Sequence, residues 1–267
     1  LVSGGRSTIA HEAIRWLYEH QGLRHFVLFS RTRPSPLDGL PDATLRYEAA
    51  DVTHKPSVER LVREARDRGT PIVGVIHCAA VLRAATIAQM DDDTFDRVCA
   101  PKTVGTTNLD EATTNCDFFW VFSSFSGLLG MPHGANHASA SAFQNAFAER
   151  RLAKGLPTTL FAWAAWRDAG VLTTQSSDVH SMITEDQGIG PIDSNVAHDA
   201  FASCWGRNGC FVVAPIHWNR FRNPVAMFSE HYQTELASGN QRFLGLSSEE
   251  RRSALVDFFR DQARSLG

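Results

Sequence analysis

The chain has 267 residues, a formal net charge of −3 and a sequence pI near 6.4. This length predicts one domain of about 240 residues and a tail, and the charge excludes the clustered cationic surface that nucleic acid binding requires. The five cysteines are odd in number and form no CxxC pair, so we expect no disulfide framework, no metal site and a reducing, cytoplasmic compartment. We also expect no membrane contact and no signal peptide, because the sequence has neither an apolar run of about 18 residues nor a charged-then-apolar leader.

Short runs rich in β-branched and aromatic residues alternate along the chain with longer amphipathic stretches. This alternation predicts an α/β fold in which helices cover both faces of a parallel sheet. A first strand at residues 1–3 is followed by predicted strands at 25–30, 45–49, 72–77, 118–123, 158–163 and 210–214. Predicted helices cover residues 8–20, 57–68, 92–116 with a break at Pro101, 135–154 and 193–205.

After residue 217 the periodic pattern fades into mixed aromatic and polar residues, which predicts a linker. Residues 247–250 read SSEE, which is typical of a capping box, and apolar side chains at helical spacing follow it. We therefore expect a domain over residues 1–217 and a C-terminal linker and helix over residues 218–267. The start at Leu1-Val2-Ser3 indicates a first strand cut from a longer polypeptide.

Three segments hold candidate catalytic residues. Residues 121–127 read VFSSFSG and residues 134–143 read GANHASASAF, so that Ser124 lies thirteen residues before His137. Residues 100–105 read APKTVG and contain Lys102. In these motifs and their order, the chain resembles the ketoreductase domains of type I polyketide synthases, which belong to the short-chain dehydrogenase/reductase superfamily. The resemblance covers almost the whole chain and implies a Rossmann-type, doubly wound parallel sheet of about seven strands, with NADPH as the cofactor.

The resemblance also assigns roles to the candidate catalytic residues. It implies that Lys102 is the catalytic Lys, that Ser124 binds the substrate carbonyl, and that His137 and Ser141 replace the family's Tyr and Asn. Reduction of a ketone requires a hydride and a proton, which the family takes from a phenol beside an ammonium group. An imidazolium can also donate a proton near neutrality, but its ring is shorter than a phenol and the Lys102 charge favours the neutral ring. The plainer interpretations are a helix-start His, an exposed helical Lys and serines that cap a strand.

The turn after the first strand is the predicted phosphate cradle of the cofactor. Glycines there let backbone amides at a helix N-terminus approach a pyrophosphate. Against the family pattern TGGTGGLG, residues 3–10 read SGGRSTIA, so Gly4 and Gly5 are kept while Ser7 and Ala10 replace later glycines. We expect weakened NADPH affinity, because a Cβ at Ser7 intrudes on the phosphate, although Arg6 offers a compensating charge.

The remaining cofactor residues follow the next three strands. The resemblance assigns them to the 2′-phosphate, to the adenine and to a turn similar to the family's HAAGV, in that order: Ser30 and Arg31, Asp51 and Val52, and Ala79 and Ala80. Residues 82–84 and Leu129 lack the family's markers of product stereochemistry, so no hydroxyl configuration is assigned. Residues 162–166 resemble the AWGxW floor of the pocket, and residues 169–190 form the predicted lid.

From these residues we predict a ketoreductase-like catalytic subdomain of a polyketide synthase that is redox-inactive and has a structural role. Its expected partners are neighbouring synthase domains and an acyl carrier protein, because the C-terminal helix resembles the linker into a carrier domain. Two alternatives remain. One is an atypical NADPH-dependent reductase of carrier-bound β-ketoacyl intermediates that uses His137 or a water, and the other is a cofactor-free epimerase.

Overall fold

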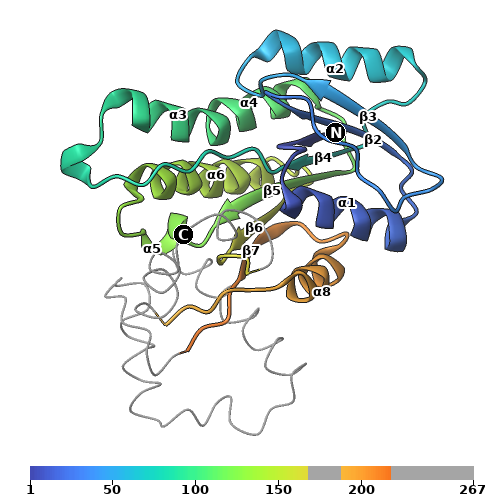
Figure 1. Cartoon of the computed structure of the whole chain (residues 1–267). Coiled ribbons are helices and arrows are strands. Elements are labelled where there is room, and N and C mark those ends of the chain that lie inside the picture. The colour runs from blue at the N-terminus through green and yellow to red at the C-terminus, as the bar shows by residue number, and fades with distance from the viewer. Residues whose placement is uncertain (168–187, 218–267) are drawn as a thin grey trace, which may run out of the picture. The chain divides into compact units, whose positions relative to one another are not determined.

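A computed structural model describes residues 1–167 and 188–217 of the chain. Apart from His217, these residues belong to one unit, Leu1–Ile216, which contains a seven-stranded, fully parallel sheet (Figure 1). The strand order is β3-β2-β1-β4-β5-β6-β7. The strands are β1 (Val2–Ser3), β2 (His25–Ser30), β3 (Thr44–Ala49), β4 (Gly74–His77), β5 (Phe118–Ser124), β6 (Thr159–Trp163) and β7 (Gly209–Val213). The predicted doubly wound parallel sheet of about seven strands is confirmed.

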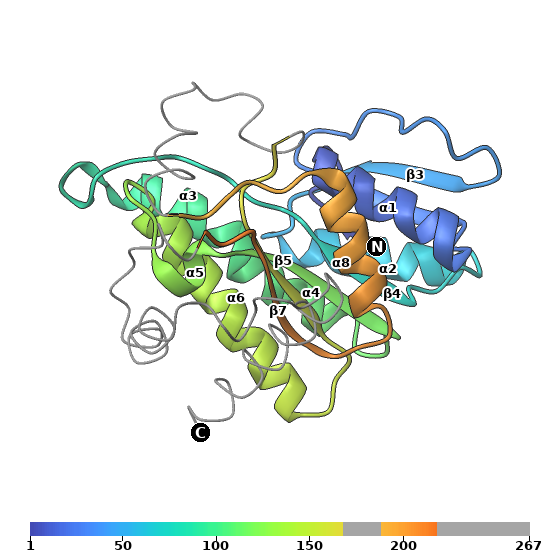
Figure 2. The same cartoon turned by 90° about the horizontal axis from the view of Figure 1, so that it is seen from below.

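Helices cover both faces of this sheet. Within the described residues they are α1 (Thr8–Gln21), α2 (Lys55–Asp67), the 3₁₀ helix η1 (Ile87–Gln89), α3 (Asp92–Lys102), α4 (Val104–Ala112), α5 (Ser126–Leu129), α6 (Ala135–Ala153) and α8 (Ser194–Cys204). Helices α2, α3, α4 and α6 pack on one face, and α1 and α8 pack together on the other (Figures 1 and 2). The observed bounds differ from the predicted ones by a few residues, and η1 and α5 are elements that the sequence pattern does not predict.

The order of the strands reverses at β1. Val2 pairs with Leu28 of β2 on one side and with Ile76 of β4 on the other. The chain winds outward from β1 to β3, then returns to β4 and winds outward in the opposite direction, which places the crossover helices on opposite faces. In such sheets ligands bind outside the carboxyl ends of the strands at the reversal point. The fold therefore places a candidate site at the ends of β1 and β4.

Alternate residues of β5 fill two separate apolar layers. Phe119 and Val121 belong to the core cluster that also holds Leu61 of α2 and Phe147 of α6. Trp120 points to the other face, where its ring centroid lies 5.1 Å from that of Phe201 in α8. Successive side chains of a strand point to opposite faces, so a central strand covered on both sides is apolar throughout. This explains why β5 reads as a continuous apolar run.

The predicted break at Pro101 divides one long helical segment into α3 and α4. Asp91 caps α3 by accepting a hydrogen bond from the Thr94 amide at 2.7 Å. Pro101 has no N–H to continue the helical hydrogen bonds, and α3 ends one residue later. Lys102 is therefore the last residue of α3, and this position directs its long side chain into the layer between α3 and α6.

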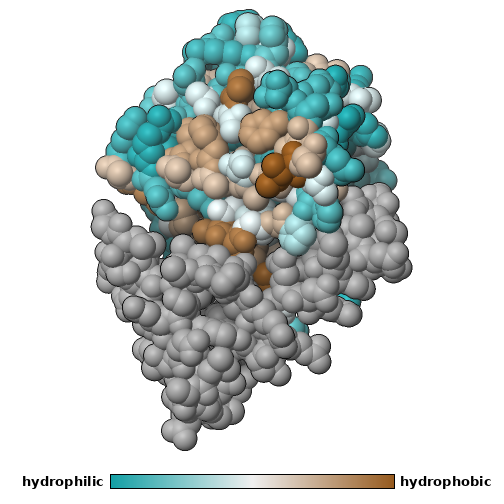
Figure 3. All heavy atoms as spheres, turned by 90° about the vertical axis from the view of Figure 1, so that its left-hand side faces the viewer, coloured by the Kyte–Doolittle hydropathy of each residue, from teal (hydrophilic) through white to brown (hydrophobic). Residues whose placement is uncertain are grey.

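The predicted lid and C-terminal helix lie for the most part outside the described residues, so the division of the chain near residue 217 remains a prediction. None of the helices in the described part of the chain is long and apolar enough to span a membrane. Large apolar side chains with substantial exposure occur on η1, α3 and α6, namely Ile87, Phe95 and Phe143. Figure 3 shows apolar side chains gathered near the middle of the face on which α3 and α5 lie, with hydrophilic side chains above and beside them.

Candidate functional site

Gly4 lies where the turn after β1 meets the turn after β4. Its φ angle is +70°, and a Cβ at this position would lie 2.7 Å from the backbone of Cys78 and Ala79. Glycine adopts this conformation without strain and has no side chain to collide with the neighbouring turn. The contact brings two predicted cofactor residues, Gly4 and Ala79, together at the reversal point of the sheet. The close approach of these two turns therefore requires glycine at position 4.

The rest of the glycine turn is held by hydrogen bonds. The amide of Ser7 donates to the Gly4 carbonyl at 2.8 Å, and Nε2 of His11 donates to the Gly5 carbonyl at 2.9 Å. Ser7 has an extended backbone (φ −75°, ψ 132°), so the turn itself does not require glycine there. Sequence reasoning missed His11, and it also missed Thr8, which stands at another glycine of the TGGTGGLG pattern. Side chains at Ser7 and Thr8 therefore flank the N-terminus of α1.

The other predicted cofactor residues follow β2, β3 and β4. Ser30 donates its hydroxyl to the Thr32 carbonyl, and Arg31 is exposed. Asp51 accepts hydrogen bonds from the amide and the hydroxyl of Thr53 at 2.9 and 2.8 Å. The last two differ in burial: Val52 is buried in the core, whereas Ala80 is exposed. Of the residues predicted to bind the cofactor after β2 and β3, Arg31 is thus exposed, whereas Val52 packs in the core.

Lys102 is 2% exposed and lies between α3, α6 and β5. Its Nζ donates to Oε1 of Gln144 at 2.8 Å and to the Phe122 carbonyl at 3.3 Å. Burial lowers the pKa of Lys102 to about 7, because the charged amine loses its hydration. The structure therefore excludes the interpretation of Lys102 as an exposed helical residue and places it beside the end of β5.

His77 links the end of β4 to β1 and α3. Its Nε2 lies 3.1 Å from the Pro101 carbonyl, which can only accept, so Nε2 carries the proton. Nδ1 then accepts from the Ser3 hydroxyl at 2.6 Å. Burial and the Lys102 charge lower the pKa of His77 to about 3. His77 is thus a neutral ring with a structural role, because it holds the carbonyl of Pro101, the residue before Lys102.

His137 is the third residue of α6 and lies in its first turn. Its amide donates to Oδ1 of Asn136 at 2.8 Å, while Nδ2 of Asn136 donates to the Arg83 carbonyl at 3.1 Å. The ring is 8% exposed, and among the described residues its Nδ1 has no hydrogen-bond partner. Burial first, and then the Lys102 charge, lower the pKa of His137 to about 3. The sequence identified the effect of Lys102, whereas burial is the larger cause.

Ser124 and Ser141 lie on β5 and α6. Ser124 accepts hydrogen bonds from the amide and the hydroxyl of Ser126 at 3.2 and 2.9 Å, so its serine cluster does organise the strand end. Ser141 is fully buried beneath α5, where a Cβ on Gly127 would lie 2.9 Å from the Ser141 Cβ. Its hydroxyl has no partner in the described part of the chain. The replacement of Asn by Ser at this position therefore leaves a short side chain in a closed space.

The sequence and the fold of this chain match a known family. The model of the KR domain matches residues 1–168, which is more than half of the chain. The chain belongs to the KR domain family. The predicted resemblance to polyketide synthase ketoreductases of the short-chain dehydrogenase/reductase superfamily is thereby confirmed.

The KR domain has relatives among polyketide synthases. It is 34% identical over 207 residues to one of the subunits of the phenolphthiocerol/phthiocerol polyketide synthase of Mycobacterium tuberculosis (strain CDC 1551 / Oshkosh), with 74% of this chain and 11% of that protein covered. A ketoreductase from the first module of phoslactomycin biosynthesis in Streptomyces sp. HK803 is 27% identical, with a TM-score of 0.74 over 82% of this chain and 53% of that one. A-type ketoreductases from a modular polyketide synthase are 25% identical, with a TM-score of 0.75 over 84% and 50%. The chain therefore spans only a small part of the synthase relative.

The chemistry open to the KR domain depends on the proton donor. At neutral pH a ring with a pKa near 3 is uncharged, so His137 is not an imidazolium that gives up a proton readily. The nearby ammonium raises the acidity of a phenol but only favours the neutral form of an imidazole. His137 is therefore a buried residue whose lowered pKa favours the neutral ring beside the charge of Lys102.

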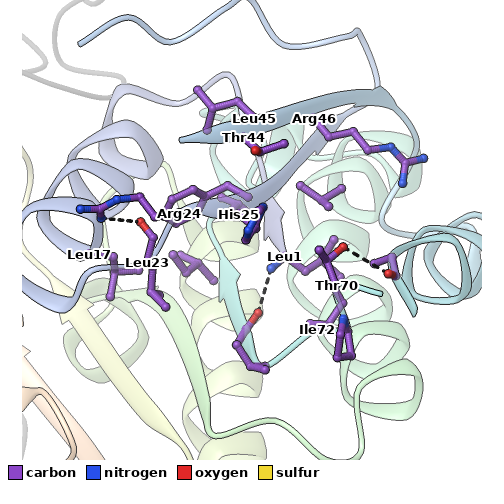
Figure 4. A pocket seen from close by; sticks show the side chains of 18 of the residues that line it. Leu1, Leu17, Leu23, Arg24, His25, Thr44, Leu45, Arg46, Thr70 and Ile72 are labelled. Carbon is purple, nitrogen blue, oxygen red and sulfur yellow. Dashed lines mark hydrogen bonds between the residues drawn. The ribbon is translucent and has the colours of Figure 1, made fainter. Parts of the chain in front are cut away.

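A separate cavity of about 870 Å³ lies at the amino-terminal ends of the strands, opposite the carboxyl ends that carry the predicted site residues (Figure 4). Its lining includes Leu1, His25, Thr44 and Ile72, and none of the predicted site residues of the KR domain. In the residues that the structure describes, no group of three or more His, Cys, Asp or Glu side chains is placed to hold a metal ion. This cavity is therefore separate from the predicted site residues, which lie at the carboxyl ends of the strands.

Proposed function

We propose that this KR domain is a redox-inactive, structural part of a polyketide synthase. The observation that carries the proposal is His137, a buried and neutral ring at the position of the family's proton donor. A ketone gains a hydride at carbon and a proton at oxygen when it is reduced, and a positioned acid accelerates the second transfer by about 10² to 10⁴-fold. Without that acid, Lys102 and Ser124 bind and orient but do not complete the reaction.

A domain-organising role is supported by the size of the relatives and by the surface. The polyketide synthase relative is a much longer protein, of which this chain covers 11%. The exposed apolar residues Ile87, Phe95 and Phe143 offer contact area for other domains. We infer that the partners are neighbouring synthase domains and an acyl carrier protein that presents a polyketide intermediate.

NADPH would supply the hydride if it bound. KR domains of this family generally bind it, and the backbone around Gly4 and the N-terminus of α1 fits its pyrophosphate. The side chains of Ser7 and Thr8 stand where the family pattern has glycines, so we expect NADPH affinity to be weak.

Titration calorimetry with NADPH tests the proposal first. We expect no binding below millimolar cofactor, whereas the Ser7→Gly, Thr8→Gly variant should bind more tightly because backbone amides then reach the phosphate. Arg31→Ala in that variant should weaken binding again if Arg31 meets the 2′-phosphate. Micromolar binding by the unaltered chain would contradict the expected loss of affinity.

Restoration of the proton donor tests the catalytic half of the proposal. We expect His137→Tyr, combined with Ser141→Asn and Ser7→Gly, to raise NADPH-dependent reduction of a β-ketoacyl thioester by about 10²-fold or more. The matched control carries His137→Phe with the same two changes and should remain inactive. NADPH oxidation and product formation are measured together, so that uncoupled oxidation is recognised.

The second candidate function is an atypical reductase, which the retained Lys102 and Ser124 favour. It requires that the unaltered chain reduce a β-ketoacyl thioester with NADPH and that His137→Phe abolish the reaction. That pair of results would overturn the redox-inactive proposal. Epimerisation of an α-substituted thioester without cofactor is measured in the same samples, by exchange of the α-proton with deuterium.

A further inference from the structure

Gln144 is a buried polar residue to which the sequence motifs assign no role. It lies on α6 seven residues after His137 and is 1% exposed. Its Oε1 accepts the shorter of the two hydrogen bonds from Lys102, at 2.8 Å against 3.3 Å for the Phe122 carbonyl. Both acceptors are neutral oxygens, so the amine is held by dipoles and not by a carboxylate.

The orientation of the Gln144 amide follows from its second partner. Nε2 of Gln144 lies 3.3 Å from the Thr106 hydroxyl, and that hydroxyl donates its single hydrogen to the Lys102 carbonyl. The Thr106 oxygen must therefore accept from Gln144, which places the NH₂ group at Thr106 and the oxygen at Lys102. The hydrogen bonds form a closed loop from Lys102 through Gln144 and Thr106 back to Lys102.

We propose that Gln144 is a positioning residue, which fixes the ε-amino group of Lys102 between α6 and β5 and favours its charged form. Burial disfavours a charged amine, whereas a hydrogen bond from the ammonium to an amide oxygen favours it. Because the Lys102 charge also acts on His137, Gln144 influences the ring at the proton-donor position without touching it. The inference concerns the state of Lys102 and does not depend on whether the domain reduces ketones.

The lysine content of the chain makes a direct test practical. The sequence contains three lysines, Lys55, Lys102 and Lys154, and the first and last are exposed. Lysine labelled with ¹³C at Cε therefore gives three NMR signals in the full chain, two of which serve as internal references. A pH titration of these signals reports the pKa of Lys102 without cofactor, substrate or activity.

Two substitutions change the acceptor in opposite directions. Gln144→Leu keeps a similar volume and removes the acceptor, so the pKa of Lys102 should fall by about one unit, a tenfold change in its acid dissociation constant. Gln144→Glu places a carboxylate at the same distance and should raise the pKa of Lys102 above that of the unaltered chain. A purely structural role for Gln144 would alter stability and leave the Lys102 titration unchanged.

The control is Asn145→Ala, which removes the neighbouring amide on α6. Asn145 accepts from the Ser123 hydroxyl at 2.9 Å, and this hydrogen bond does not involve Lys102, so the Lys102 titration should match that of the unaltered chain. If the far-ultraviolet circular dichroism shows that Gln144→Leu is unfolded, the titration of Lys102 in Gln144→Glu tests the proposal. The proposal is overturned if Lys102 titrates identically in the unaltered chain and in the folded Gln144 variants.

Discussion

His77 and His137 are buried rings beside the Lys102 ammonium, and each has its pKa lowered to about 3, chiefly by burial. In the unfolded chain an imidazole binds a proton below about pH 6.5. Between these values the unfolded state holds more protons than the native state, so the free energy of unfolding decreases as the pH falls. Each ring contributes about 1.4 kcal/mol per pH unit to the slope of the free energy of unfolding in this range. The substitution His137→Phe should remove the contribution of His137 to that slope.

Urea unfolding at a series of pH values from about 7 to 4 measures this slope. Equal slopes for the unaltered chain and for His137→Phe would contradict the prediction and would mean that the ring reaches water in the native state. The neutral-ring argument for a redox-inactive site would then lose its basis.

Motifs locate some residues of the site and not others. Lys102, Ser124 and His137 were placed by short sequence strings at characteristic spacing. Gln144 cannot be predicted from a motif, because its partner Lys102 lies 42 residues away on another helix and no local pattern indicates a contact between helices. His11 was missed for a related reason, since its role depends on a carbonyl in the preceding turn. Burial, the main cause of the low pKa of His137, is likewise a property of the packed structure.

Helix α6 is tied to α4 by a buried guanidinium. Arg151 is 3% exposed, pairs with Asp110 of α4, and donates to the Thr158 hydroxyl at 3.0 Å and the Pro157 carbonyl at 3.1 Å. Its Cζ also lies 4.2 Å from the centroid of the Phe119 ring. Asp110→Ala leaves this charge without its counter-ion, so we expect the free energy of unfolding to fall by about 2 kcal/mol, less than for a fully buried pair because Asp110 keeps some solvent contact.

The adjacent residue supplies a matched control. Glu111 on the same helix pairs with Lys55 at 2.6 Å, and both side chains are about half exposed. Exposed ion pairs contribute little, so Glu111→Ala should cost less than about 1 kcal/mol. Chemical denaturation of both variants measures the difference. Equal costs would show that the Arg151 charge is compensated by its neutral partners alone.

At the scale of elements, sequence signals predicted the strands and long helices because each has a clear apolar period or a cap. Pro101 marked the division between α3 and α4 since proline removes a helical donor. Helix α2 begins at Lys55, two residues before the predicted start, because Pro56 is tolerated in the first turn. Helix α5 has four residues and no period of its own, so its position depends on packing against α6.

For the whole molecule, the alternation of strands and helices predicted the fold class and the family resemblance predicted the double winding, while the contact between the turns after β1 and β4 is a property of the folded structure. The sheet has two halves that wind in opposite directions, β1 to β3 and β4 to β7. They meet where the turns after β1 and β4 come into contact at Gly4. This junction lies beside both the predicted cofactor residues and His77, which contacts Ser3 and the Pro101 carbonyl.

Gly4→Ala tests how far the molecule depends on that junction. A methyl group there would lie 2.7 Å from the backbone of Cys78 and Ala79, in the turn that directly follows β4 and is packed against the turn after β1. Gly22→Ala is the control, because Gly22 has a similar φ of +68° but nothing within 4 Å of its added methyl group. We expect Gly22→Ala to lower the free energy of unfolding by about 1 kcal/mol through backbone strain alone, and Gly4→Ala by about 3 kcal/mol. Denaturant unfolding of both variants decides the matter: if the two cost the same, the turns after β1 and β4 separate easily and the two halves of the sheet are not locked together at Gly4.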